Sequence, residues 1–272
     1  MLQNTLLETI QGSYRDFSKL VPGTRRHVDE LWNDRLVNPE LRNKWFYTAD
    51  GAVYFTRDGK PYFAITRERS NPAFKNLDEA YKQLGETRNY RVPEEDLESA
   101  LADPETELFE LSKLNWNNSL LELSTKNPEL DSLSEDGRRL IHRVYGKDNF
   151  DEVMSMLAKR WSITRTYVLN PDYVREHASA GAFGRASWLW NISFYADDYN
   201  ISGHYRLRGV VQSESAGESN SDRAKKRGRL SVFKGMEGGE LSVIGEGVGG
   251  LTVTSEEPVE EKRYFWKKIL RK

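Results

Sequence analysis

The segment from Trp188 to Val211 alternates apolar and polar residues, and this alternation constrains the fold more than any other feature of the chain. With a two-residue turn at Asp197-Asp198, Trp188 lies opposite Leu207 and Trp190 lies opposite Tyr205 on one face. The other face then carries the polar side chains of Asn191, Ser193, Tyr195, Asn200, Ser202, His204, Arg206 and Arg208. Because a shift of one residue would exchange the two faces, the sequence predicts an antiparallel hairpin over 188–211 in this register.

A second hairpin is predicted between residues 52 and 66. Two apolar runs flank Asp58-Gly59, and this dipeptide favours a two-residue turn in which both residues have positive φ. Both faces of the two strands are apolar, so we expect the hairpin to be covered on both sides. Pro61 cannot donate to a strand partner, so we expect its position to be a local edge.

Helices are predicted mainly in the N-terminal half. Apolar residues recur at spacings of three and four from Leu6 to Val21, which predicts an amphipathic helix that ends at Pro22-Gly23. A second helix begins near Thr24, and further helices follow Asn76 and Pro93. The stretch 107–124 fits either two strands or a poor helix, and the sequence leaves this choice open.

The predicted fold class is α+β: a helical N-terminal half with β-hairpins, then an α/β segment that leads into an antiparallel sheet or meander. We expect an N-terminal α+β subdomain over 1–128 and a C-terminal α/β subdomain over 129–256. The second subdomain includes a loop at 212–228 that is rich in small and charged residues and is expected to be mobile. Residues 257–272 form a charged linker and an amphipathic basic tail.

Composition narrows the function classes. The 272 residues hold 40 Lys and Arg against 42 Asp and Glu, which gives a net charge of −2, so a protein that coats DNA through a global basic excess is not indicated. The chain has no cysteine, which excludes disulfides and thiolate metal sites and fits a reducing compartment. No window is apolar enough to predict a transmembrane segment, and we expect a cytoplasmic protein.

Known catalytic motifs do not occur in the context they need. Gly245 to Gly250 matches G-x-G-x-x-G, but a strand pattern follows it where a dinucleotide site needs a helix. The four histidines lack zinc-ligand spacing. We therefore predict no metal and no cofactor.

Two groups of residues are candidate ligand sites. On the polar face of the predicted hairpin, Asn191, Tyr195, His204, Arg206 and Arg208 could bind a phosphate or carboxylate group. The alternative is an ordinary solvated face of a sheet. Asn170 is a further candidate, because it lies between a predicted strand and helix; the alternative there is a structural helix cap.

The C-terminal tail is a candidate partner-binding segment. As a helix, it would place Phe265, Trp266, Ile269 and Leu270 on one side and basic residues, including Lys267 and Lys268, on the other. Such a segment could dock on a partner protein, lie on an anionic membrane or pack on its own domain.

These observations favour a non-catalytic interaction or assembly protein of a larger intracellular complex, with a protein partner or self-association. The alternative is a nucleic-acid- or phosphate-ligand-processing enzyme that uses the polar face of hairpin 188–211, with nucleic acid held by a local basic patch. A second alternative is membrane-surface association through the basic tail.

Overall fold

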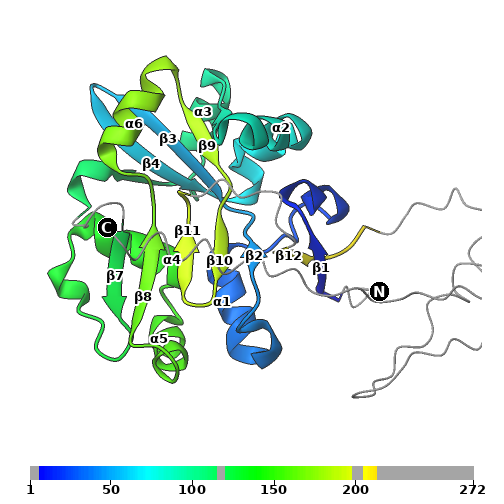
Figure 1. Ribbon diagram of the computed structural model, residues 1–272, viewed down its shortest axis with the longest axis vertical. Coiled ribbons are helices and arrows are strands. Elements are labelled where there is room, and N and C mark those ends of the chain that lie inside the picture. The colour runs from blue at the N-terminus through cyan, green and yellow to red at the C-terminus, as the bar shows by residue number, and fades with distance from the viewer. Residues whose placement is uncertain (1–5, 115–119, 198–204, 213–272) are drawn as a thin grey trace, which may run out of the picture. The chain divides into compact units, whose positions relative to one another are not determined.

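The computed structural model describes residues 6–114, 120–197 and 205–212. The chain divides into two compact units, Met1–Ser215 and Ala216–Lys272, and every described residue belongs to the first. The predicted meander, the loop after residue 212, the tail and His204 lie outside the described residues. In the described ranges the fold is mixed α+β, as the sequence predicts, and it contains two sheets (Figure 1).

The larger sheet has seven strands within the described ranges and draws them from both ends of the first unit. In spatial order they are β1 (Glu8–Gly12), β12 (Tyr205–Gly209), β2 (Phe46–Tyr47), β10 (Trp188–Trp190), β11 (Ser193–Tyr195), β8 (Ile163–Tyr167) and β7 (Leu120–Ser124). The pairs β12–β2 and β11–β8 are parallel, and the other pairs are antiparallel.

The smaller sheet is antiparallel and has five strands among the described residues. In spatial order they are β5 (Tyr90–Arg91), β9 (Phe183–Arg185), β3 (Gly51–Arg57), β4 (Lys60–Thr66) and β6 (Glu107–Glu110). Its centre is the predicted hairpin, in which Asp58 and Gly59 have φ values of 52° and 72°. Pairing with β6 begins only at Tyr62, so Pro61 is at a local edge, as predicted. Strands from both sides of residue 128 pair in each sheet.

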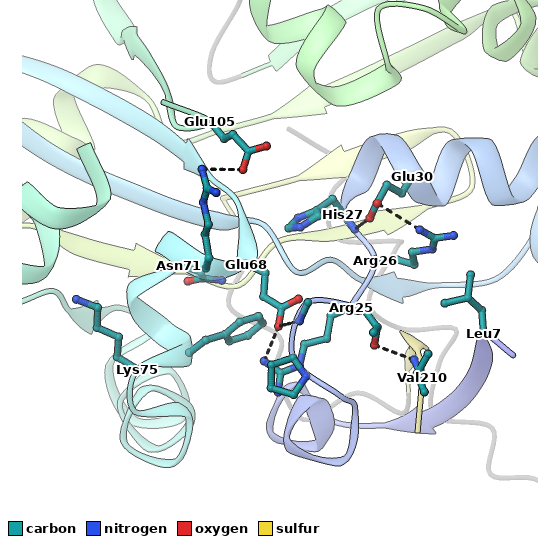
Figure 2. A pocket seen from close by; sticks show the side chains of 15 residues that line it. Leu7, Arg25, Arg26, His27, Glu30, Glu68, Asn71, Lys75, Glu105 and Val210 are labelled. Carbon is teal, nitrogen blue, oxygen red and sulfur yellow. Dashed lines mark hydrogen bonds and ion pairs between the residues drawn. The ribbon is translucent and has the colours of Figure 1, made fainter. Parts of the chain in front are cut away.

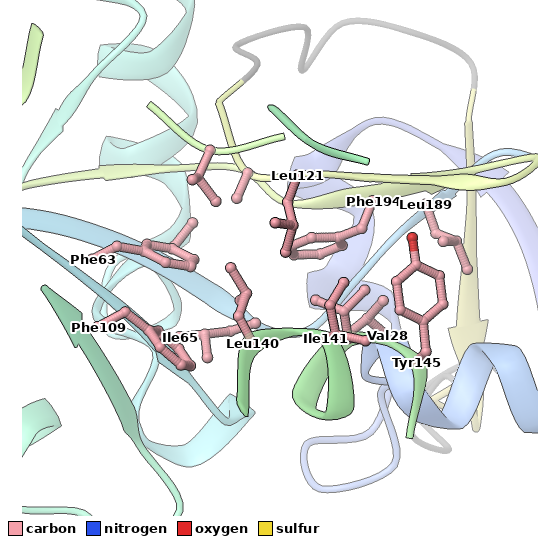
Figure 3. Close-up of a cluster of buried hydrophobic side chains, with 14 of the residues drawn as sticks. Val28, Phe63, Ile65, Phe109, Leu121, Leu140, Ile141, Tyr145, Leu189 and Phe194 are labelled. Carbon is pink, nitrogen blue, oxygen red and sulfur yellow. The ribbon is translucent and has the colours of Figure 1, made fainter. Parts of the chain in front are cut away.

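Helices cover defined faces of these sheets. The described α-helices are α1 (Val28–Val37), α2 (Leu77–Thr87), α3 (Glu94–Leu101), α4 (Glu135–Tyr145), α5 (Phe150–Ala158) and α6 (Pro171–His177). Residues of α1, α4 and α5 form one core with Leu121, Leu189 and Phe194 of the larger sheet (Figure 3). On the smaller sheet, α2 and α3 pack on one face of β3 and β4, and α6 contacts these strands from the other core. The central hairpin is therefore covered on both sides, as expected.

The predicted helix from Leu6 to Val21 is wrong. The segment forms β1, which pairs with β12, followed by a 3₁₀ helix over Tyr14–Lys19. Gly12 permits the close turn between them, because a Cβ atom there would lie 2.6 Å from a carboxylate oxygen of Asp16. That carboxylate accepts the backbone N–H of Ser13 at 2.7 Å and holds the turn.

The predicted pairing of hairpin 188–211 is also wrong. Strand β10 turns back at Asn191-Ile192 and pairs with β11, so Trp188 lies opposite Tyr195. Asn191 has a φ of 43°, a left-handed conformation that asparagine tolerates better than most residues. Strand β12 does not pair with β10, because β2 lies between them. The ambiguous stretch 107–124 contributes two strands, β6 and β7, which belong to different sheets.

Candidate functional site

Most of the predicted ligand residues do not come together. Arg208 donates from Nε to Asp34 Oδ2 at 2.7 Å and from Nη1 to Thr9 at 2.9 Å, so its charge is used inside the fold. Arg206 lies on the same strand, with no ion pair among the described residues. Tyr195 shares a face with Trp188 and not with the arginines, which corrects its predicted place on a polar face.

Asn170 has the structural role that was the alternative to a ligand site. Its Oδ1 accepts the backbone N–H of Tyr173 at 2.7 Å and caps α6, whose first residue is Pro171. Asn191 lies in the turn between β10 and β11, and β2 separates β10 from β12, the strand of Arg208. The predicted hairpin face is therefore not assembled as a site by the described residues.

A different cluster occupies the face of the larger sheet that is opposite α1, α4 and α5. Side chains from five neighbouring strands, β12, β2, β10, β11 and β8, and from the residue before β2 form what we call the aromatic row. Its members are Trp45, Tyr47, Tyr167, Trp188, Trp190, Tyr195 and Tyr205. The sheet order brings these residues together from segments that are far apart in the sequence.

The rings of the row stack on one another across the strands. Tyr167 and Tyr195 have centroids 4.5 Å apart at an interplanar angle of 7°, and Tyr195 and Trp188 are 4.3 Å apart at 17°. Trp45 stacks on Trp188 and on Tyr205, with centroids 5.0 Å away in each case. Ring faces therefore contact neighbouring rings.

The row is neither a closed core nor a fully exposed surface. Tyr47 and Trp188 are buried, whereas Trp45, Tyr167, Trp190, Tyr195 and Tyr205 are half-buried. The indole Nε1 of Trp188 is buried and has no hydrogen-bond acceptor in the described part of the chain. The sequence places Trp188, Trp190 and Tyr205 on one apolar face. It does not reveal Trp45, Tyr47 and Tyr167, which are distant in sequence, or Tyr195, which follows the unpredicted turn at 191–192.

A charged cleft of about 700 Å³ lies between the loop before α1 and the segment that follows β4 (Figure 2). Its cations are matched by carboxylates: Arg25 lies 3.0 Å from Glu68, Arg26 lies 3.2 Å from Glu30, and Arg69 lies 3.0 Å from Glu105. Burial lowers the pKa of Arg25, and the charge of Glu68 opposes this shift. Because these charges neutralise one another, the cleft has little net attraction for an ion.

A buried charge network lies next to this cleft. Asp50 is fully buried and accepts the N–H of Val28, the first residue of α1, at 2.7 Å. Its other carboxylate oxygen lies 3.1 Å from Nη2 of Arg143 and 3.2 Å from Nδ1 of His27. Burial alone would raise the pKa of Asp50, but His27 and Arg143 outweigh it and hold the pKa well below its usual range. The network joins α1 to α4 and is structural.

The described residues contain neither a candidate metal site nor a candidate membrane-spanning helix. Across residues 6–114, 120–197 and 205–212, no three or more His, Asp or Glu side chains lie close enough together to hold a metal ion. None of the helices in these ranges has the length and apolar character needed to span a bilayer.

Comparison with known proteins gives a likeness of fold. No family model matches the sequence, and no curated protein matches it. A solved structure described as "Accommodation of massive sequence variation in Nanoarchaeota by the C-type lectin fold" matches with a TM-score of 0.54 and 12% sequence identity. The match covers 77% of this chain and 100% of that chain. The protein therefore resembles the C-type lectin fold, and at this identity the likeness concerns the fold alone.

Proposed function

We propose that this protein is a non-catalytic binding module that assembles through the aromatic row, with a second copy of the chain as its partner. The observation that carries the proposal is the half-buried row on the sheet face opposite α1, α4 and α5. Tyrosine and tryptophan are enriched in protein interfaces, where they contribute much of the binding energy. The likeness to a lectin fold supports a binding role and specifies no ligand.

The stacking geometry favours a protein partner over a sugar or a nucleic acid base. Sugars and bases bind aromatic side chains by stacking on open ring faces. In the row, the faces of Trp188 and Tyr195 already contact neighbouring rings at 4.3 Å. A protein partner does not need open ring faces, because the edges of aromatic rings pack well against apolar side chains and backbone carbonyls.

Charge at one end of the row favours a second copy of the chain. Arg165 on β8 and Glu122 on β7 form an ion pair of 3.0 Å, and both side chains are partly exposed. In a two-fold interface, if one residue contacts a second residue on the other copy, the second residue of the first copy also contacts the first residue of that other copy. Arg165 of one copy can therefore pair with Glu122 of the other, and Glu122 of the first copy with Arg165 of the second. The central members of the row carry no formal charge and would not repel their equivalents.

The test compares two substitutions that place the same charge at different positions. Trp190→Glu puts a carboxylate into the row. Val37→Glu replaces an apolar side chain at the end of α1, which is 83% exposed, with a carboxylate. We expect Trp190→Glu to weaken self-association by at least about tenfold, because burying an unpaired charge at an interface is costly. Val37→Glu should associate as the wild type does, and light scattering over a concentration series measures both.

A charge exchange provides a control that leaves the aromatic rings unchanged. Arg165→Glu should weaken association, and the double variant Arg165→Glu with Glu122→Arg should restore it. Equal association of Trp190→Glu and Val37→Glu, or a double variant no better than Arg165→Glu, would contradict the proposal.

The enzyme and the membrane-association hypotheses from the sequence remain predictions. An enzyme that uses the polar face of residues 188–211 finds less support, because Arg208 is committed to Asp34. The hypotheses that depend on the tail concern residues outside the described ranges, and liposome sedimentation of the full chain tests membrane association.

A further inference from the structure

A second pocket, of about 420 Å³, opens on the helix side of the larger sheet. It lies between the segment after α1 and the end of α5. Its apolar wall includes Trp32, Leu157 and Trp161, and its rim carries Arg42, Lys159 and Arg160. No carboxylate lines it within the described residues. The pocket thus combines an apolar interior with an excess of positive charge.

The three cations of the rim have no carboxylate partner in the described part of the chain. Arg42 donates from Nε to the carbonyl of Arg35 at 3.0 Å and from Nη2 to that of Leu36 at 3.3 Å. Arg160 donates from Nη1 to the side chain of Asn43 at 3.1 Å. Most other arginines of the fold form ion pairs, as Arg25 and Arg208 do.

Asp151 and Glu152 are the nearby acidic residues. They line an adjoining hollow that also includes Arg42 and Lys159. Neither carboxylate forms an ion pair with these cations among the described residues, so the donor groups of the rim are not engaged by a carboxylate there.

A buried cation behind the pocket adds to the imbalance. The side chain of Arg35 is fully buried, and it donates to the carbonyls of Asn191 at 2.8 Å and Lys44 at 2.6 Å. Its guanidinium lies 4.8 Å from the ring centroid of Trp32. Burial lowers the pKa of Arg35 to about 9, so the group is still charged at neutral pH. A buried charge without an opposite charge is costly, and an anion nearby would reduce that cost.

Two buried donors beside the pocket also lack acceptors. The indole Nε1 of Trp32 and the Nε of Arg35 have no hydrogen-bond partner in the described ranges. Buried polar groups are nearly always paired in folded proteins, so two such donors together with a cationic rim indicate a missing acceptor-rich group. Trp32 is itself part of the pocket wall.

We propose that this pocket binds a small organic phosphate whose flat apolar body packs against Trp161 and Leu157 while its phosphate meets Arg42, Lys159 and Arg160. Three cations match a group that carries nearly two negative charges at neutral pH better than they match a single carboxylate. The pocket volume falls within the range of small-molecule sites. Asn191, a candidate ligand residue on sequence grounds, lines this pocket. The site is on the other side of the sheet from the aromatic row and does not depend on the proposed assembly.

The test uses phenyl phosphate as the probe, with benzyl alcohol as its uncharged comparison, and isothermal titration calorimetry on the full chain. The pocket variant is Lys159→Glu with Arg160→Glu. The control is Lys82→Glu with Arg91→Glu, which makes the same change in net charge at two exposed residues outside the pocket lining. Circular dichroism establishes that each variant is folded.

We expect phenyl phosphate to bind the wild type and the control equally, to bind the pocket variant at least tenfold more weakly, and to bind more tightly than benzyl alcohol. We expect Trp161→Ala to weaken binding of phenyl phosphate while leaving binding of inorganic phosphate unchanged. The proposal is overturned if the wild type does not bind phenyl phosphate, or if the pocket variant and the control bind it equally. If Trp161→Ala weakened the binding of phenyl phosphate and of inorganic phosphate equally, the apolar wall would likewise be excluded from the site.

Discussion

At the scale of single residues, most of the described arginines form ion pairs and a few do not, and the position of each side chain decides what a substitution does. Arg206 and Arg208 are two residues apart on β12, so they lie on the same side of the strand. Only Arg208 reaches Asp34, a buried acid on α1 that also lies 3.3 Å from Nε of Arg26. Arg208 therefore has a structural role, whereas the side chain of Arg206 forms no ion pair with a described residue.

Arg208→Ala should lower the free energy of unfolding by about 2 kcal/mol, because it removes charge-assisted hydrogen bonds to a poorly exposed carboxylate. Arg206→Ala should change the free energy of unfolding by less than about 0.5 kcal/mol, as is usual for substitutions without specific partners. Urea unfolding of both variants measures the difference. Equal losses would show that the ion pair to Asp34 does not stabilise the fold.

Asp50→Asn should destabilise the protein by about 3 kcal/mol at neutral pH, because it leaves the buried Arg143 with only a 3.8 Å contact to the carboxylate of Glu107. The folded-state pKa of Asp50 lies below its unfolded value, so its charge stabilises the fold fully above that unfolded value. This contribution is lost as the pH falls toward the folded-state pKa. The difference between wild type and variant should therefore shrink below pH ~4, the usual carboxyl value. A difference that stays constant from neutral to acidic pH would contradict this account.

At the scale of secondary-structure elements, local patterns in the sequence predicted turns and caps well. Asp58-Gly59 forms the predicted turn, Asn76 caps α2 through Glu79, and Pro93 precedes α3. These features depend on the backbone preferences of a few neighbouring residues. The choice of strand partner does not depend on them, and the predictions failed mainly there.

The hairpin over 188–211 shows why. Alternation determines which residues share a face only while the strand continues. After the two-residue turn at Asn191-Ile192, odd-numbered residues lie on the face that even-numbered residues occupy before it. The side chain of Tyr195 therefore lies on the same face as that of Trp188, although an odd number of residue positions separates them in the sequence. The strand between β10 and β12 comes from Phe46-Tyr47, about 140 residues earlier, and local alternation contains no information on that partner.

A matched pair of glycine substitutions tests whether backbone conformation decides the effect of a residue on a turn and on a helix. Gly59 has a φ of 72° with open space around it, so Gly59→Ala should cost about 1 kcal/mol through its backbone conformation alone. Gly85 lies inside α2, where Gly85→Ala should stabilise the helix by about 0.5–1 kcal/mol. Urea unfolding should give opposite signs for the same chemical change, and two losses of equal size would contradict the assignment.

At the scale of the whole molecule, the first unit presents two different faces that carry the proposed sites. One side of the larger sheet carries the aromatic row, and the other is packed by α1, α4 and α5 with a cationic pocket near their ends. Sequence reasoning identified the fold class and three members of the row. It could not find the pocket, because Arg42 and Arg160 approach each other only through the packing of α1 against α5.

In the proposed assembly, the aromatic row holds two copies of the chain together. Sedimentation equilibrium of the full-length protein, followed from low concentration to about 100 μM, tests it most directly. We expect a mass that rises with concentration from 31.4 kDa toward twice that value. A mass that stays at 31.4 kDa throughout would contradict the claim and leave the row without the partner proposed for it.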